Sequence, residues 1–123
     1  MITAAVHHIS YAVSDLERSQ RFYGETLGLD PIERPDLGLP GAWYSVGNAE
    51  VHLILTPAGA DVGTRPASLT PLANHNAFAV SDYQETVEHF KNAKIEVLET
   101  SPDRGQLWIR DPDGNVLEFI SAR

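Results

Sequence analysis

The chain has 123 residues, of which 42% are hydrophobic and 21% are charged, and its formal net charge is -8. This length and composition suit one globular domain, or two half-domains that share a core, and argue against disorder and membrane spans. The acidic charge argues against nucleic acid as a partner, and the lack of cysteine excludes disulfides and thiolate ligands. Because the start, MITAAVHHIS, lacks the pattern of a secretory signal, we expect a cytoplasmic protein with no membrane partner.

The first half of the chain is predicted to form a strand, a helix and three further strands. The first strand begins at His8, and Ser14 and Asp15 then offer side-chain oxygens to cap a helix over 16–28. Gly28 is expected to end this helix as a left-handed cap. Turn signals rich in glycine, proline and aspartate separate three strand candidates, over 31–33, 42–46 and 50–55.

The second half repeats this order after a long connection. Residues 57–73 are rich in Gly, Pro, Ser and Thr, and they predict a 17-residue linker. A strand begins at His75, Ser81 and Asp82 precede a helix over 83–93, and strand candidates follow over 95–99, 106–110 and 116–120. We therefore expect a single domain over 1–123, with a first module over 1–56 and a second over 74–123.

Two similar segments support this duplication. HISYAVSD begins at His8 and HNAFAVSD begins at His75, and five of their eight positions are identical. When the two halves are aligned with a gap of one residue near the end of the first helix, His52 also aligns with Glu118. A repeat of this length is typical of two copies of one supersecondary unit. The aligned positions carry imidazoles and a carboxylate, which are ligands of borderline divalent metals.

Strand alternation predicts that these four side chains share one face. Small residues follow each first-strand histidine on its own side, while bulky residues on the other side need a helix to cover them. The same parity separates His52 and Glu118 from their apolar neighbours. A single histidine is more often packed than metal-bound, and His7, on the opposite face, and His89, on the second helix, are set aside for that reason. The candidate ligands on one face are His8, His52, His75 and Glu118.

The motifs HISYAVSDLERSQRFYGETLGLD, HNAFAVSD and RDPDGNVLEF resemble those of the vicinal oxygen chelate superfamily. That superfamily includes glyoxalase I, extradiol dioxygenases, methylmalonyl-CoA epimerases, and fosfomycin and bleomycin resistance proteins. The resemblance covers almost the whole chain and is weakest over 31–41 and 57–73. It implies an α+β fold in which two βαβββ modules form a half-open curled sheet, with the helices on the outer face.

The resemblance also implies that one divalent metal is bound by His8, His52, His75 and Glu118. Members of the superfamily differ at the position of His52, so two ligand sets remain open. Without His52, the other three residues form a two-histidine, one-carboxylate set, which is favoured for Fe(II). With His52, two positions of an octahedron remain for substrate or water. Zn, Ni, Mn, Co and Fe are all chemically compatible with these ligands.

Departures from the family pattern narrow the expected reaction. Trp108 stands where extradiol dioxygenases and fosfomycin-modifying relatives tend to have tyrosine, and Ala12 stands where typical glyoxalase I sequences carry arginine. We expect a glyoxalase-like lyase or isomerase, in which the metal activates a small-molecule substrate and Glu118 serves as a catalytic base. The alternatives are a binding or resistance protein for a hydrophobic or cationic compound, and an Fe(II) dioxygenase.

Three side chains are predicted to bind substrate. Trp108 and Arg110 share strand parity, and Arg110 is able either to bind an anionic group or to pair with Asp111 or Asp113. Tyr44 is the third candidate, although alternation alone leaves open whether Tyr44 or Trp43 faces the ligands. Relatives often form dimers, with the ligands within one chain or divided between two, so a homodimer is the expected assembly.

Overall fold

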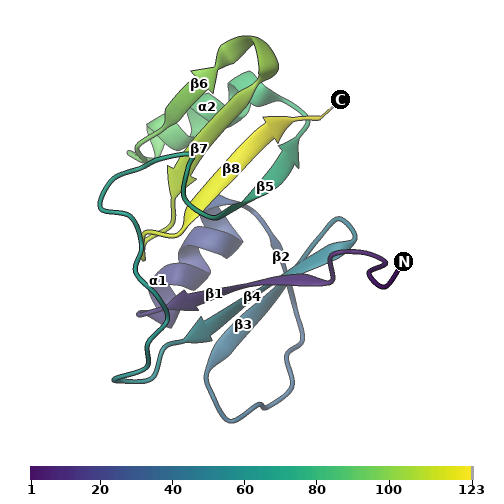
Figure 1. The fold of residues 1–123 in the computed structure, drawn as a ribbon, viewed down its shortest axis with the longest axis vertical. Coiled ribbons are helices and arrows are strands. Elements are labelled where there is room, and N and C mark those ends of the chain that lie inside the picture. Colours follow the sequence, from purple (N-terminus) through teal and green to yellow (C-terminus); the bar gives the residue numbers. More distant parts are fainter. Residues whose placement is uncertain (123) are drawn as a thin grey trace. The chain divides into compact units, whose positions relative to one another are not determined.

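The computed structural model describes residues 1–122 and divides them into two compact units, which meet in sequence at Gly63 and Thr64. We call them the N-terminal unit and the C-terminal unit. The division falls inside the predicted linker of residues 57–73. Each unit has the same order of elements, a strand, a helix and three strands, as expected from the repeat (Figure 1).

The N-terminal unit is a four-stranded mixed sheet with one helical segment. Its elements are β1 (His8–Val13), α1 (Leu16–Gln20), the π-helix η1 (Arg21–Thr26), β2 (Asp30–Ile32), β3 (Gly41–Val46) and β4 (Ala49–Leu55). The sheet order is β1-β4-β3-β2, in which β1 runs parallel to β4 and the other pairs are antiparallel. The helical segment covers one face of the sheet, where the rings of Tyr11 and Tyr23 stack at 5.4 Å between centroids.

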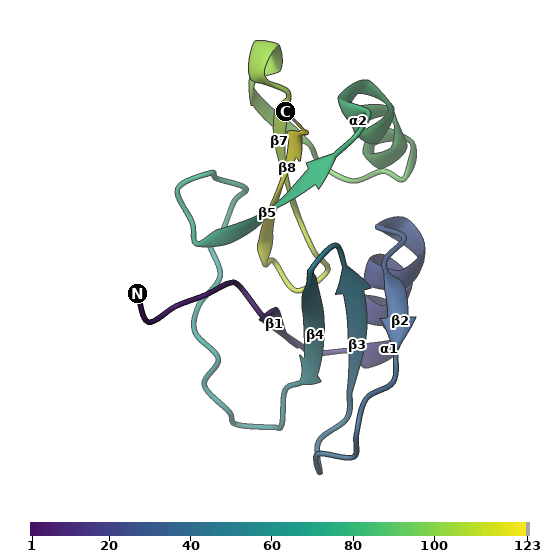
Figure 2. The same ribbon diagram turned by 90° about the vertical axis from the view of Figure 1, so that its right-hand side faces the viewer.

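The C-terminal unit repeats this topology. It contains β5 (His75–Val80), α2 (Tyr83–Asn92), β6 (Leu98–Ser101), the short 3-10 helix η2 (Pro102–Arg104), β7 (Gln106–Arg110) and β8 (Val116–Ser121). The order β5-β8-β7-β6 again has one parallel pair, β5 with β8. Figure 2 shows α2 on one side of this sheet, where Phe90 packs on Phe119 with ring centroids 4.9 Å apart. The α+β fold class predicted from the sequence is confirmed.

The predicted helix starts are confirmed at both aspartates. The side chain of Asp15 accepts a hydrogen bond from the backbone of Arg18, and Asp82 accepts one from Glu85, each at 3.0 Å. Each bond satisfies one of the free N–H groups at a helix start. Gly28 adopts a φ of 73°, so it provides the left-handed cap expected after the first helix.

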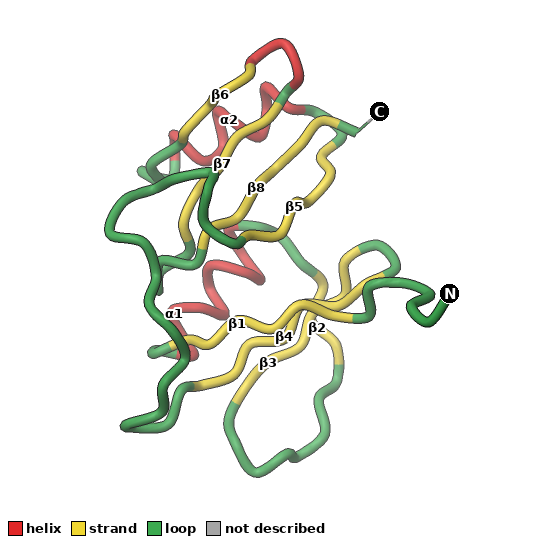
Figure 3. Tube along the Cα trace, viewed as in Figure 1, coloured by secondary structure: helices red, strands yellow, loops and turns green. Residues whose placement is uncertain are grey.

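Figure 3 colours the helices, strands and loops of the structure, and two of the predicted elements differ from them. The first helix is not regular over 16–28, because it changes at Arg21 to a π-helix in which the amide of Leu27 donates to the carbonyl of Phe22. The strand predicted over 95–99 is β6, which begins later, at Leu98. Lys94 has a φ of 63° and the amide of Ile95 turns back to the carbonyl of Phe90, so the chain is still leaving α2 at these residues.

No helix in the described part of the chain is both long enough and apolar enough to cross a membrane.

Candidate functional site

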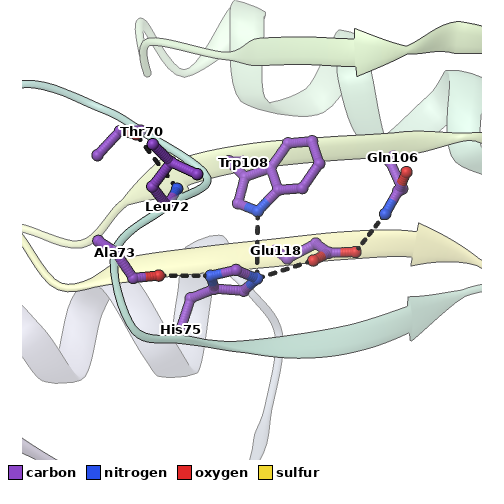
Figure 4. Close-up of polar contacts among 7 residues, drawn as sticks. All are labelled: Thr70, Leu72, Ala73, His75, Gln106, Trp108 and Glu118. Atoms are coloured by element: carbon purple, nitrogen blue, oxygen red, sulfur yellow. Dashed lines mark hydrogen bonds and ion pairs between the residues drawn. The ribbon is translucent and has the colours of Figure 1, made fainter.

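Two of the predicted ligands meet in the C-terminal unit. In the parallel pair β5 and β8, Ala77 lies opposite Glu118, so His75 and Glu118 are diagonal neighbours on one face of the sheet. The Nε2 atom of His75 lies 2.9 Å from Oε1 of Glu118 (Figure 4). Both side chains are largely shielded, with exposed fractions of 22% for His75 and 9% for Glu118. We call this side of the sheet the histidine face of the C-terminal unit.

A backbone carbonyl fixes the orientation of the His75 ring. Nδ1 of His75 lies 2.7 Å from the carbonyl oxygen of Ala73, just before β5. Because a carbonyl oxygen only accepts, Nδ1 carries the hydrogen and Nε2 is the nitrogen presented to Glu118. Histidines that bind metals almost always donate their other ring N–H in this way, to a carbonyl or a carboxylate. The contact therefore suits His75 to ligation through Nε2.

Glu118 is held from its other side by Gln106, a residue that the sequence analysis did not select. The amide Nε2 of Gln106 donates to Oε2 of Glu118 at 3.0 Å, which leaves Oε1 turned toward His75 (Figure 4). A nearly buried carboxylate is costly unless it is paired or hydrogen-bonded, and these contacts meet that need. Strand alternation could have identified this residue, because Gln106 lies two residues before Trp108 in β7 and so on the same face of the sheet.

Trp108 also lies on the histidine face of the C-terminal unit. It is opposite Glu118 in the β7–β8 register and only 5% exposed. Its indole Nε1 lies 3.4 Å from Nε2 of His75, and the two rings are edge-on, with an interplanar angle of 86°. The predicted grouping of Trp108 with His75 and Glu118 is thus present within this unit.

The other two predicted ligands lie together in the N-terminal unit. His8 and His52 have the same diagonal register, because Ser10 lies opposite His52 in the parallel pair β1 and β4. Their rings stack with centroids 4.0 Å apart and an interplanar angle of 16°. Nε2 of His52 donates to Oε1 of Glu50 at 2.8 Å. Glu50 was not selected from the sequence, although it stands two residues before His52 on the same side of β4.

The register of β3 resolves the choice between Trp43 and Tyr44. Trp43 lies opposite His52 and stacks on its ring at 4.1 Å, with an interplanar angle of 7°. Tyr44 points to the other face, where its ring lies close to Gly24 in the helical segment, and burial raises the pKa of its hydroxyl. The structure therefore places Trp43, and not the predicted Tyr44, on the face of the N-terminal sheet that carries His8 and His52.

Arg110 is engaged by a partner other than those considered from the sequence. Its Nη2 lies 2.9 Å from Oε1 of Glu96, and its Nη1 donates to the carbonyl of Ala67 at 3.4 Å. Arg110 and Glu96 line an open surface pocket of about 410 Å³ next to the Asp111 turn. An anionic substrate group would have to compete with Glu96 for the guanidinium.

His7 lies closer to the candidate site than alternation suggests. β1 begins at His8, so strand parity does not extend to His7, and Nδ1 of His7 lies 2.9 Å from Nδ1 of His8. In the residues that the structure describes, neither unit by itself gathers three or more His, Asp or Glu side chains in an arrangement that could hold a metal ion. The four-ligand set takes two side chains from each unit, and it stays a prediction.

Comparison with known proteins places the chain in a family. The sequence model of the Glyoxalase/Bleomycin resistance protein/Dioxygenase superfamily matches residues 5–119. The Arabidopsis thaliana protein "Glyoxylase I 4" is 27% identical over 124 residues, which cover 96% of this chain and 71% of the plant protein. Glutathione transferase FosA of Serratia marcescens is 29% identical over 118 residues, covering 94% and 79% of the two chains.

A solved structure agrees with this assignment. The crystal structure of a glyoxalase family protein from Bacillus anthracis has a TM-score of 0.80 and 27% sequence identity, and the match covers 100% of this chain and 98% of that chain. The resemblance drawn from the three sequence motifs is thereby confirmed. The chain belongs to the Glyoxalase/Bleomycin resistance protein/Dioxygenase superfamily.

Proposed function

We propose that this protein is a metal-dependent, glyoxalase-like enzyme that acts as a lyase or isomerase on a small molecule. The observation that carries the proposal is the His75–Glu118 pair, in which an oriented imidazole nitrogen lies 2.9 Å from a nearly buried carboxylate oxygen. Names of relatives lend support, because they include a glyoxylase and a glutathione transferase.

The donors of this pair fit a borderline divalent cation. His75 turns Nε2 toward Glu118 because its Nδ1 is bonded to Ala73, and Gln106 holds the second carboxylate oxygen. Imidazole nitrogen and carboxylate oxygen are the ligands that Zn, Ni, Mn, Co and Fe accept in proteins. In the proposed site, the histidines of the N-terminal unit complete the ligand set.

The bound cation, Glu118 and Trp108 would have separate roles in the proposed reaction. A bound divalent cation supplies Lewis-acid polarisation of substrate oxygens. The carboxylate of Glu118, which Gln106 orients through Oε2, would accept a proton from the substrate. Trp108, nearly buried beside His75, excludes water from this proton transfer.

Metal analysis tests the proposal directly. Protein purified without chelator should contain about one divalent ion per chain, as a single ligand set requires. His75→Ala and Glu118→Ala should each abolish stoichiometric metal. His89→Ala is the matched control, because His89 lies exposed on α2 and should leave the metal content unchanged. Stoichiometric metal in both site variants would contradict the assignment.

A substrate panel then tests the reaction class. Adducts of 2-oxoaldehydes with thiols, epimers of acyl-CoA thioesters and catechols separate isomerase, epimerase and dioxygenase chemistry. Turnover of an adduct or an epimer that disappears in Glu118→Ala supports the proposed proton transfer. Oxygen consumption with a catechol would instead support the Fe(II) dioxygenase alternative.

The proposed assembly is a homodimer. A His8→Ala chain and a Glu118→Ala chain each lack one predicted ligand. If mixing them restores metal binding, the ligand set is divided between two chains; if it does not, each chain supplies its own set. Sedimentation of the wild-type protein gives the oligomeric state independently.

A further inference from the structure

The open surface pocket of the C-terminal unit has an ion pair in its wall. Its volume of about 410 Å³ lies in the range of sites that bind small molecules. The residues that line it are Ile95, Glu96, Arg110, Asp111, Pro112 and Gly114. All six belong to the C-terminal unit, so the pocket is formed within one compact part of the chain.

Arg110 is the cation of this ion pair, and it is positioned to receive a ligand. It ends β7, where its Nη2 donates to Oε1 of Glu96 at 2.9 Å and its Nη1 donates to the carbonyl of Ala67 at 3.4 Å. The side chain is 31% exposed, so the guanidinium is partly shielded from water but can still be reached. A guanidinium has five N–H donors in a planar fork that matches a carboxylate. Arg110 can therefore bind a carboxylate and keep its contact with Ala67.

Glu96 is the more exposed partner of the ion pair, with 66% of its side chain open to water. An exposed ion pair contributes little to stability, because water solvates both groups well when they separate. A ligand that displaces Glu96 from Arg110 therefore loses little of its binding energy. The guanidinium, which is partly shielded, then needs a new negative partner.

The charges of the wall select the kind of ligand. A simple anion would pair with Arg110 but would lie beside the carboxylates of Glu96 and Asp111, in a chain whose net charge is -8. A simple cation would pair with Glu96 but would leave Arg110 without a negative partner. A molecule that carries a carboxylate and an ammonium group on one carbon replaces both halves of the ion pair. The wall therefore favours an α-amino acid.

The rest of the pocket offers apolar surface. Ile95 lies just after α2, where its amide donates to the carbonyl of Phe90 at 3.0 Å. Pro112 lies in a turn that the amide of Gly114 closes on the carbonyl of Asp111, also at 3.0 Å. Both apolar side chains thus stand on backbone that hydrogen bonds hold in place. An aliphatic ligand group placed against them would be removed from water, which favours binding.

We infer that this pocket binds a small apolar α-amino acid, such as leucine. The carboxylate of the ligand pairs with Arg110, its ammonium group donates to Glu96, and its aliphatic side chain lies against Ile95 and Pro112. This site is independent of the proposed metal chemistry and adds a second ligand to the protein.

Titration of the isotope-labelled full chain with L-leucine, followed by NMR, tests the inference. The amide signals of Glu96 and Gly114 should shift and saturate, with a Kd of about 1 mM or lower, within reach of a ligand of this size. The amide of Gln84, exposed on α2, should not move. EDTA is present throughout, so that leucine cannot bind as a ligand of a metal ion. Absence of shifts at Glu96 and Gly114 would overturn the inference.

Two analogues of leucine test whether both charges are recognised. Isocaproate lacks the ammonium group, and isoamylamine lacks the carboxylate. Each should bind the wild-type protein at least about tenfold more weakly than leucine, the scale of one lost hydrogen bond to a charged group. An affinity equal to that of leucine for either analogue would contradict recognition through both groups. This comparison needs no variant, so it holds even where a substitution disturbs folding.

Two glutamine variants then test the assigned partners. Arg110→Gln should weaken leucine binding by about tenfold or more. Glu96→Gln should have effects of opposite sign, weaker binding of leucine but tighter binding of isocaproate, because the competing carboxylate is gone. Lys91→Gln is the matched control for Arg110→Gln, since it removes a cation from another ion pair of the same unit, with Glu99, and should leave the Kd for leucine unchanged.

The remaining results are equally decisive. Unchanged leucine affinity in folded Arg110→Gln would overturn the inference, and so would isocaproate binding that Glu96→Gln does not improve. Thermal unfolding establishes that each variant is folded. None of these results bears on the proposed function, which metal analysis tests separately.

Discussion

The indole Nε1 of Trp108 points at Nε2 of His75 across 3.4 Å, the same nitrogen that faces Glu118. A hydrogen bond of this length is weak, and a cation bound at Nε2 would displace the indole N–H. The chain has two tryptophans, so a Trp43→Phe variant leaves Trp108 as the single indole. Its emission therefore reports on the predicted metal ligand.

We expect Zn²⁺ to change the emission of Trp108 in the Trp43→Phe protein, since the indole loses its contact with His75. The same titration of Trp43→Phe combined with Glu118→Ala should give no change. Trp108→Phe, which retains Trp43, separates the response of the C-terminal unit from that of the N-terminal unit. Equal responses with and without Glu118 would show that Zn²⁺ binds elsewhere.

Gln106→Leu is expected to weaken metal binding by about 10–100-fold, the range for a residue that orients a ligand. Leucine keeps much of the side-chain volume but cannot donate to Oε2 of Glu118, so that oxygen loses its partner. Co²⁺ titration measures the change. Gln84→Leu makes the same substitution at an exposed position of α2 and should leave the Kd unaltered. Equal Kd values for the two variants would show that Gln106 does not contribute to metal binding.

Tyr83 should make stability depend on alkaline pH. Its hydroxyl lies 2.6 Å from Oε1 of Glu99 and 3.0 Å from the carbonyl of Gln106. Burial, the hydrogen bond to Glu99 and the charge of Glu99 raise the pKa of Tyr83 above its usual value near 10. The neutral hydroxyl thus favours the folded state below about pH 10, and this contribution falls as rising pH ionises tyrosine in the unfolded chain.

Tyr83→Phe should lower the free energy of unfolding by about 1.5–3 kcal/mol at pH 8, the scale of a hydrogen bond to a charged group. The difference from wild type should shrink between pH 9 and 11. Urea unfolding of both proteins over this range measures it. A difference that stays constant with pH would mean that the Tyr83 hydroxyl does not titrate differently in the two states.

Alanine substitutions at Gly105 and Gly28 should lower the stability of the protein by different amounts. Both have positive φ, 63° and 73°, but a Cβ on Gly105 would lie 2.8 Å from Cβ of Ser121, while Gly28 has nothing within 4 Å. Gly28→Ala should cost about 1–2 kcal/mol of stability from the left-handed backbone alone. Gly105→Ala should cost about 1–3 kcal/mol more, because β8 must move. Thermal unfolding distinguishes them, and equal losses would contradict the close contact.

Much of the fold follows from local signals in the chain. The aspartate caps, Gly28 and the alternation of large and small residues locate most elements. The Gly47-Asn48 turn predicts the strand register, which alternation alone does not. A two-residue hairpin pairs Val46 with Ala49 and so places Trp43 opposite His52. Counting back from this turn would have excluded Tyr44 from the candidate site.

Other features depend on contacts that no sequence period encodes. The π-helix η1 has the same apolar spacing as an ordinary helix at this length, and it differs only by the longer hydrogen bond from Leu27 to Phe22. The late start of β6 depends on the positive φ of Lys94, a residue type that rarely adopts it. The contacts of His52 with Glu50 and Trp43 arise from ring orientation, which strand parity leaves open.

The place of β8 in its sheet has a consequence for how the protein is made. β8 lies between β5 and β7, so the ribosome synthesises it after both of its neighbours. β5 and β7 therefore cannot pair with β8 until residue 121 has left the exit tunnel. The strands β1 to β4, by contrast, can all pair once residue 55 has emerged. Vectorial synthesis thus favours early folding of the first sheet, and Glu118 reaches His75 only after β8 has emerged.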